Sequence, residues 1–410
     1  MTDTSATQIT QTLVLPYLNH AVRMLEQSYA TRADIDNAMR FGCGYPRGPL
    51  TTLDDLGLDV VRDGLAARYA ETGDNLHKPA DLLEKLVAEG RTGKAAGRGF
   101  YTYADADGEV SVVADDQTPS ADDQPQLKHE ITTVGVVGTG TMASGIVQVF
   151  AAAGYDVVFV GRGEDKVAGV VAGITKGLDK LIERGKSDEE TKTAILGRLT
   201  GATSREALAD VDIVVEAIAE DLELKLELFR DFDRIIKAGA ILATTTSSLP
   251  ITQLAAATSR PESVIGMHFF NPATVMKLVE VVTAPATAAD VNETTLALCA
   301  KVGKVAVSCA DRSGFIVNAL LFPYLNDACK LAESGVELDV INDAIKSEAG
   351  FPMGPFQLLD VVGNDVSLAI QRELFAEFKE PGFAPAASLE KVVADGHLGR
   401  KTKKGFHDYS

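Results

Sequence analysis

Two residues twelve positions apart, His268 and Glu280, have the types expected of an acid–base pair. Each lies in an apolar run, at residues 264–270 and 277–282, and the two positions are symmetric about Thr274. If the runs pair as antiparallel strands, the two side chains are cross-strand neighbours. A carboxylate beside an imidazole fixes its tautomer and raises its basicity, which suits a general base that takes a hydroxyl proton. A lone strand histidine is more often a core or surface residue, but an unpaired carboxylate in an apolar run is costly.

A second chemical motif is the glycine-rich segment Gly138-Thr139-Gly140-Thr141-Met142-Ala143, which follows an apolar run and precedes a helical pattern. In this G-x-G-x-x-G/A context the first glycine permits a tight turn, and the second lets the backbone approach a pyrophosphate. The free N–H groups of the helix N-terminus favour the anion. The segment therefore predicts a dinucleotide site at residues 138–142, with a glycine turn that binds nothing as the alternative.

The end of the next strand, at residues 156–160, departs from an NAD-selective pattern. Such a site expects an acid there for the adenosine ribose, whereas this sequence has Gly161 and Arg162. A glycine leaves room, and a guanidinium matches a 2′-phosphate. The pair favours NADP over NAD, unless Arg162 is a solvated surface residue and another group holds the ribose.

These residues lie in a region where short apolar runs alternate with helical patterns. Further strands are expected at residues 213–216 and 240–244, with a helix at 222–237 between them. Such alternation is typical of a parallel sheet covered by helices on both faces. We therefore expect an α/β, Rossmann-type doubly wound sheet domain.

The two flanks of this region have helical patterns and match each other. Pro16-Tyr17-Leu18-Asn19 recurs as Pro323-Tyr324-Leu325-Asn326, and Gly44-Tyr45-Pro46-Arg47-Gly48-Pro49 recurs as Gly350-Phe351-Pro352-Met353-Gly354-Pro355. From Gly44 onward all such pairs are 306 residues apart. Many matches in one register indicate two homologous all-α helical domains.

The predicted domains are a degenerate helical copy at 1–104, a linker at 105–130, the Rossmann-type domain at 131–312 and a helical C-terminal domain at 313–410. The linker is acidic, contains proline and has few large apolar residues. We expect it to remain unfolded, because it cannot bury enough apolar surface.

Composition excludes several classes of protein. A formal net charge of -19 over 410 residues disfavours nucleic-acid and membrane partners. The four cysteines, Cys43, Cys299, Cys309 and Cys329, form no C-x-x-C or zinc-like pattern, so we expect buried, reduced thiols and no metal. Neither a secretory signal nor an 18-residue apolar run occurs, which favours a cytoplasmic protein.

Several segments together resemble the L-3-hydroxyacyl-CoA dehydrogenase family, from residue 131 to the C-terminus. They are Thr246-Ser247-Ser248-Leu249, Gly266-Met267-His268-Phe269-Phe270-Asn271-Pro272, Met276-Lys277-Leu278-Val279-Glu280-Val281, Val215-Glu216-Ala217-Ile218-Ala219-Glu220 and Ser313-Gly314-Phe315-Ile316-Val317-Asn318. The resemblance implies interconversion of an (S)-3-hydroxyacyl-CoA, with a short acyl chain, and its 3-keto form. The alternatives are a dehydrogenase of a free small hydroxy acid on the same fold and a non-catalytic dinucleotide-binding protein.

The resemblance also implies roles for matched positions. His268 takes the proton of the 3-hydroxyl as hydride leaves C3 for the nicotinamide, and Glu280 supports it. Ser247 and Asn318 hydrogen-bond the substrate oxygen and the base. The residues implied to hold the cofactor are Glu220, Lys225, Asn271 and Lys401. Coenzyme A is implied near a basic stripe formed by Lys176, Lys180 and Arg184, although a solvated helix face is an equal alternative.

The N-terminal copy lacks these chemical groups. Its counterparts of Asn318 and Lys401 are Gln11 and Ala95, so we expect a structural role for it. In the family this helical domain makes the dimer interface. A second copy in one chain therefore predicts a monomer built around an internal pseudo-dimer, with an ordinary homodimer as the alternative.

Overall fold

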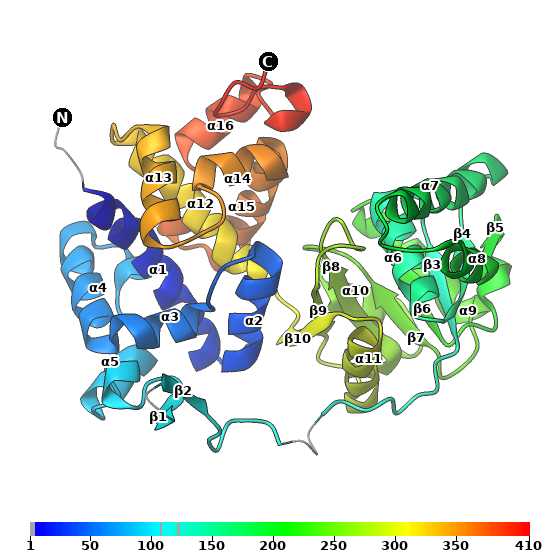
Figure 1. Cartoon of the computed structure of the whole chain (residues 1–410), viewed down its shortest axis with the longest axis horizontal. Helices are drawn as coiled ribbons and strands as arrows, with labels where there is room; N and C mark the ends of the chain where they lie inside the picture. Colours follow the sequence, from blue (N-terminus) through cyan, green and yellow to red (C-terminus); the bar gives the residue numbers. More distant parts are fainter. Residues whose placement is uncertain (1–4, 107–108, 121–123) are drawn as a thin grey trace. The chain divides into compact units, whose positions relative to one another are not determined.

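The computed structural model describes residues 5–106, 109–120 and 124–410, which form two compact units (Figure 1). One unit combines Met1–Thr118 with Ser313–Ser410, and the other is Pro119–Arg312. The first is mainly helical and the second is the α/β unit. The two helical flanks recognised in the sequence therefore fold together.

The α/β unit contains an eight-stranded sheet in the order β10-β9-β8-β7-β6-β3-β4-β5. Its strands are β3 (Thr133–Val137), β4 (Asp156–Val160), β5 (Leu199–Ala202), β6 (Ile213–Glu216), β7 (Ile241–Thr244), β8 (Val264–Phe269), β9 (Leu278–Thr283) and β10 (Val305–Ala310). Its helices are α6 (Thr141–Ala152), α7 (Glu164–Glu183), α8 (Glu189–Gly197), α9 (Leu222–Ile235), α10 (Ile251–Ala256) and α11 (Ala289–Lys301).

Six of these strands are mutually parallel and have the doubly wound order. The strand order reverses between β3 and β6, so the carboxyl ends of both strands open at the point where such folds bind ligands. β9 then pairs antiparallel with β8. Every residue of β6, β7 and β8 is buried, which explains their continuous apolar sequences.

The helical unit contains two copies of one five-helix arrangement. The first consists of α1 (Ala6–Glu26), α2 (Arg32–Cys43), α3 (Pro49–Leu56), α4 (Leu58–Thr72) and α5 (Asp81–Ala88). The second consists of α12 (Val317–Glu333), α13 (Leu338–Glu348), α14 (Pro355–Val362), α15 (Asn364–Phe378) and α16 (Ala387–Ala394). None of the described helices is long and apolar enough to cross a membrane.

The two copies pack against each other through equivalent residues. Tyr45 stacks on its counterpart Phe351 with ring centroids 3.7 Å apart. Tyr17 and its counterpart Tyr324 lie 6.2 Å apart, and Tyr17 also meets the edge of Phe351. All but Phe351 of these four are at least nine-tenths buried. The recurring sequence thus forms an apolar interface within one chain.

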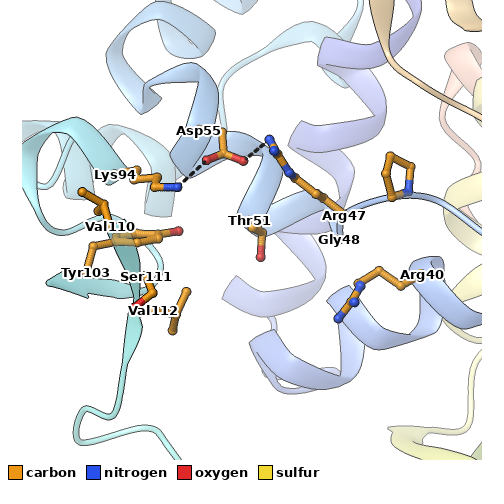
Figure 2. A pocket seen from close by; sticks show the side chains of 11 residues that line it. Arg40, Arg47, Gly48, Thr51, Asp55, Lys94, Tyr103, Val110, Ser111 and Val112 are labelled. Carbon is orange, nitrogen blue, oxygen red and sulfur yellow. Dashed lines mark hydrogen bonds and ion pairs between the residues drawn. The ribbon is translucent and has the colours of Figure 1, made fainter. Parts of the chain in front are cut away.

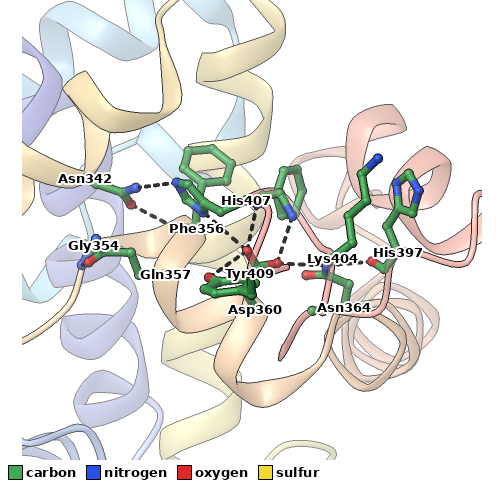
Figure 3. A network of polar contacts seen from close by, with 12 residues as sticks. Asn342, Gly354, Phe356, Gln357, Asp360, Asn364, His397, Lys404, His407 and Tyr409 are labelled. Atoms are coloured by element: carbon green, nitrogen blue, oxygen red, sulfur yellow. Dashed lines mark hydrogen bonds and ion pairs between the residues drawn. The ribbon is translucent and has the colours of Figure 1, made fainter. Parts of the chain in front are cut away.

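Each copy closes its C-terminal tail on a buried aspartate. Asp360 accepts hydrogen bonds from the backbone N–H groups of Phe406 and His407, at 2.8 and 2.9 Å, and from the Tyr409 hydroxyl at 3.0 Å (Figure 3). Asp54 does the same for its own tail, whose donors are Phe100 N–H, Tyr101 N–H and the Tyr103 hydroxyl. Burial raises the pKa of Asp54 to about 6.

The segment expected to be an unfolded linker is partly folded. β1 (Thr102–Ala106) and β2 (Glu109–Val113) form an antiparallel hairpin, and Asp115 forms an ion pair with Arg32. The Arg32 guanidinium also lies over the Tyr101 ring, 4.6 Å from its centroid. The low number of apolar residues wrongly predicted an unfolded segment, because main-chain pairing and a buried ion pair stabilise it. Its residues 107–108 and 121–123 lie outside the described residues.

The other end of the predicted linker is tied to the α/β unit. The backbone N–H groups of Lys128 and His129 both donate to the Thr294 hydroxyl on α11, at 3.0 and 3.1 Å. The His129 imidazole lies 3.1 Å from the Asp290 carboxylate. Both ends of the segment are therefore anchored.

Candidate active site

The structure brings His268 and Glu280 together as cross-strand partners in β8 and β9. The imidazole Nδ1 lies 2.7 Å from Glu280 Oε2. Glu280 is fully buried and His268 is 6% exposed, so the contact is shielded from water. The Phe270 ring packs beside the imidazole, with centroids 4.7 Å apart. The carboxylate therefore engages Nδ1 of the imidazole.

An ion triad with two fully buried members and one partly exposed member, Glu220, stands at the carboxyl end of β6. The Lys225 ammonium lies 2.8 Å from both oxygens of Glu216 and 3.1 Å from Glu220 Oε2. Lys225 and Glu216 are both fully buried, and the Thr244 hydroxyl donates to Glu216 at 2.6 Å. Buried charges persist only when they are paired in this way.

Glu220 connects this triad to the loop that carries Ser247. It accepts hydrogen bonds from the Thr246 hydroxyl at 2.5 Å and from the Ser247 N–H at 2.8 Å. Burial alone would raise the pKa of Glu220, but the Lys225 ammonium and these hydrogen bonds outweigh it and lower the pKa. The carboxylate is therefore kept ionised and positions the backbone of Ser247.

The glycine-rich turn has the geometry that a pyrophosphate site needs. Gly138 has a φ of 137°, and a Cβ there would lie 2.3 Å from the carbonyl oxygen of Ala217. A Cβ on Gly140 would meet no protein atom within 4 Å, so this backbone faces open space. Helix α6 begins directly after Gly140 with no side-chain cap on its N–H groups. These features fit a dinucleotide, whose phosphates the α6 N-terminus would hold.

Comparison with known proteins matches both parts of the chain. Residues 133–312 match the 3-hydroxyacyl-CoA dehydrogenase NAD binding domain, and residues 9–103 and 314–409 both match the C-terminal domain of the same family. The chain belongs to the 3-hydroxyacyl-CoA dehydrogenase family. The duplication inferred from the sequence is thereby confirmed, as is the α/β architecture flanked by two helical domains.

The relatives of this dehydrogenase chain include enzymes that lack the extra copy. A 3-hydroxybutyryl-CoA dehydrogenase of Clostridioides difficile is 42% identical over 278 residues, which cover 68% of this chain and 99% of the relative. The mitochondrial hydroxyacyl-coenzyme A dehydrogenase of Mus musculus is 42% identical over 293 residues, 69% of this chain and 91% of the relative. The crystal structure of (S)-3-hydroxybutyryl-CoA dehydrogenase from Ralstonia eutropha is 40% identical with a TM-score of 0.67, covering 68% of this chain and all of that one.

Other residues expected at the dehydrogenase site lie in both units. Asn271 is exposed and precedes a cis peptide bond to Pro272. Asn318 lies in the first turn of α12, and Lys401 forms an ion pair with Asp365 at 2.5 Å, both in the helical unit. Their contacts with substrate or cofactor therefore stay predictions.

The basic stripe expected to meet coenzyme A lies on the last turns of α7. Lys176, Lys180 and Arg184 are all exposed, and Arg184 is the C-cap residue of the helix. The three side chains follow one helix face at a spacing of four residues. A role in coenzyme A binding stays a prediction for this face.

Sequence reasoning gave no role to two residues that shape the site, Glu216 and Thr246, and it missed a packing role of Thr139. Glu216, at the end of an apolar strand, is the buried partner of Lys225, a role that the sequence motif alone does not indicate. Thr246 caps the loop that carries Ser247, since its hydroxyl also accepts from the Leu249 N–H at 2.9 Å. Thr139 faces Gly161, where an added Cβ would lie 2.6 Å from Thr139 Cγ2. A charged residue that ends an apolar strand was the available signal for Glu216.

The cysteines agree only partly with expectation. Cys299, Cys309 and Cys329 are buried, and none of the four forms a disulfide in the described structure. Burial raises the pKa of Cys299 to about 12, so its thiol stays protonated. Cys43 is only half-buried, because it lies at the end of α2. Among the described residues no group of three potential ligands could hold a metal ion.

Proposed function

We propose that this protein interconverts (S)-3-hydroxyacyl-CoA thioesters and 3-ketoacyl-CoA thioesters with a nicotinamide dinucleotide. The observation that carries this proposal is the buried 2.7 Å contact between His268 and Glu280 in a chain of this family. Short acyl chains are proposed because relatives at about 40% identity are named 3-hydroxybutyryl-CoA dehydrogenases.

In the oxidative direction, His268 removes the proton from the 3-hydroxyl through Nε2. A nicotinamide dinucleotide held at residues 138–142 would supply the acceptor for the hydride from C3. The imidazolium that forms gains a charge within 2.7 Å of Glu280, whose carboxylate stabilises it. In the reductive direction His268 returns the proton to the new alkoxide, so one residue serves as base and acid.

The remaining residues are proposed to orient the reactants. Ser247 and Asn318 donate hydrogen bonds to the substrate oxygen. The N-terminus of α6 and residues 138–142 hold the pyrophosphate. Glu220, Asn271 and Lys401 contact the cofactor, while buried Lys225 acts through Glu220, to which its ammonium is bound. Lys176 and Arg184 attract the phosphates of coenzyme A.

The substrate class is tested by an absorbance assay of NADH oxidation with acetoacetyl-CoA and with free acetoacetate. We expect turnover of the thioester. The kcat/KM for the free acid should be lower by at least about 10²-fold, since binding of the remote part of a substrate contributes to the rate. Equal turnover of the free acid would instead support a hydroxy-acid dehydrogenase. Binding of NADH without turnover of either compound would support a non-catalytic protein.

We propose NAD(H) as the working cofactor, because the matched domain is an NAD binding domain. Packing explains why position 161 has no side chain, because a Cβ there would collide with the methyl group of Thr139. The sequence-based preference for NADP(H) then depends on exposed Arg162 alone.

This packing predicts that Gly161→Asp alone weakens the binding of both dinucleotides. Its Cβ would lie 2.6 Å from Thr139 Cγ2 and 3.1 Å from Val167 Cγ2. Thr139→Ala/Gly161→Asp removes the first collision, so the new carboxylate can meet the ribose. We expect the double variant to bind NADH at least about tenfold more tightly than Gly161→Asp and to reject NADPH. Dissociation constants measured by fluorescence titration, with Thr139→Ala as the control, decide this; equal values for the single and double variants would contradict it.

We further propose that the two helical copies form an internal pseudo-dimer, so that the full chain is a monomer. The symmetric contact of Tyr45 with Phe351 supports this. A shortened chain that begins at Leu127 would expose the face of α12 and α13 that α1 covers. Light scattering should give a monomer mass for the full chain, and a dimer or aggregate for the shortened one. A fully active, monomeric shortened chain would refute the proposal.

A further inference from the structure

The N-terminal copy contains a cavity of about 270 Å³ in the helical unit, between α2, α3, the 3₁₀ turn at Lys94–Ala96 and the β1–β2 hairpin. Three cationic side chains line it: Arg40, Arg47 and Lys94. Figure 2 shows Asp55 between Lys94 and Arg47, with Arg40 on the far side of the cavity. Three cations and one carboxylate leave a local charge of +2 in a chain whose net charge is -19.

We propose that this cavity is a binding site for a compact dianion, a phosphate monoester or a similar small phosphorylated metabolite. Two guanidinium groups and an ammonium are the donors that proteins use for phosphate. The cavity volume accommodates a phosphoryl group with a small organic body. Val110, Val112 and Pro46 supply apolar walls for that body.

The three cationic side chains can bind a ligand without the loss of a strong existing interaction. The Arg47 guanidinium lies 2.5 Å from Asp55, but 61% of its side chain is exposed, and such exposed pairs contribute little net free energy. Lys94 lies 3.9 Å from the same carboxylate, which is a weak contact. Arg40 forms no ion pair with any carboxylate that the structure describes. A dianion therefore gains two or three charge-assisted hydrogen bonds without breaking a buried interaction.

Two further carboxylates lie behind the wall, and both are occupied by donors. Asp36 accepts from the Leu50 and Thr51 N–H groups at 2.7 and 3.1 Å and from the Tyr101 hydroxyl at 3.0 Å. Asp54 accepts from the Tyr103 hydroxyl and two N–H groups of the tail. Both carboxylates are thus bonded to donors of the helical core. Asp55 is the carboxylate that lines the cavity itself.

The site is particular to the N-terminal copy. The C-terminal copy keeps a cation at two of the four positions, where Lys346 and Arg400 stand for Arg40 and Lys94. It has Met353 in place of Arg47 and Val361 in place of Asp55. The N-terminal copy, which lacks counterparts of Asn318 and Lys401, therefore has a set of charged side chains that the C-terminal copy keeps only in part. This inference does not rest on the proposed dehydrogenase activity.

The test is calorimetric titration of the full chain with inorganic phosphate, pyrophosphate and glycerol 3-phosphate. Saturating NADH is present, so that the probes do not occupy the glycine-rich turn. We expect one site with a dissociation constant below about 1 mM. Arg40→Gln and Lys94→Gln should each raise that constant at least about tenfold, because each removes a charge-assisted contact.

Arg62→Gln is the matched control, because Arg62 lies in the same copy, pairs with Asp63 and does not line the cavity. It should leave the dissociation constant unchanged. Ser111→Glu, which adds a carboxylate to the exposed hairpin wall, should abolish binding without touching the helical core. Absence of binding for all three probes, or equal binding by Arg40→Gln, Lys94→Gln and the control, would overturn the proposal.

Discussion

His268→Gln is expected to lower kcat by about 10²- to 10⁴-fold, the usual contribution of a positioned acid–base group. Glutamine occupies similar space and keeps a hydrogen-bonding group near Glu280, but it cannot carry a proton. Dissociation constants for NADH should stay within about twofold of wild type, since the glycine-rich turn is a separate part of the sheet edge. Steady-state acetoacetyl-CoA reduction and NADH titration measure the two quantities.

The matched control for this variant is His129→Gln in the same unit. His129 lies near the surface and contacts Asp290, so its loss should leave kcat unchanged. Near-normal turnover of His268→Gln would remove the proposed mechanism. An equal loss in the control would show instead that histidine replacement acts through folding.

Lys225→Met is expected to destabilise the folded chain by about 3–5 kcal/mol, the usual result of removing one partner of a buried ion pair. The substitution leaves the Glu216 carboxylate with no counter-charge at a fully buried position. Lys225→Met/Glu216→Gln should recover most of the loss, because no buried charge then remains. Urea unfolding monitored by circular dichroism gives the free energies.

The control is Lys192→Met, whose ammonium pairs with Asp179 at the surface of the α/β unit. Exposed pairs contribute about 0–1 kcal/mol, so little should change. The pH dependence adds a second readout. A lowered pKa of Glu220 in the folded state gives stability at neutral pH that is lost as the pH falls through that pKa. Lys225→Met should flatten this acid dependence; a free energy within about 1 kcal/mol of wild type would contradict the account.

The sequence predicted the contact between His268 and Glu280 because strand geometry is regular. In antiparallel strands, positions symmetric about a turn face each other, so His268 and Glu280 could be paired without knowing the rest of the sheet. The duplicated helical copies were predictable for a similar reason, since a constant offset of 306 residues needs no structural model of either copy.

Burial of Lys225 was not predictable from local pattern. A single lysine on the amphipathic helix α9 has the same sequence signature whether it faces solvent or a buried carboxylate. Only the tertiary position of Glu216, on the neighbouring strand, decides between them. The collision between Thr139 and Gly161 is of the same kind, because it joins two strand ends that are distant in sequence.

The hairpin at Thr102–Val113 shows a different limit. Its strand β2 is mostly exposed: Val110 and Val112 alternate with polar residues over only five positions, and both side chains face solvent and not a core. Main-chain pairing with β1 and the contact of Arg32 with Asp115 define it instead. The same hairpin forms a wall of the cationic cavity, which is why that cavity could not be inferred from the sequence.

In the proposed reaction, hydride is transferred to C3 of an acyl-CoA thioester and His268 donates the proton. Acetoacetyl-CoA can be reduced with NADH that carries deuterium at the transferred position of C4, and the product analysed by mass spectrometry and NMR. We predict one deuterium at C3 of (S)-3-hydroxybutyryl-CoA with the wild-type chain, and product formation slowed about 10²-fold or more with His268→Gln. An unlabelled product, deuterium at another carbon, or equal rates for the two chains would contradict the account.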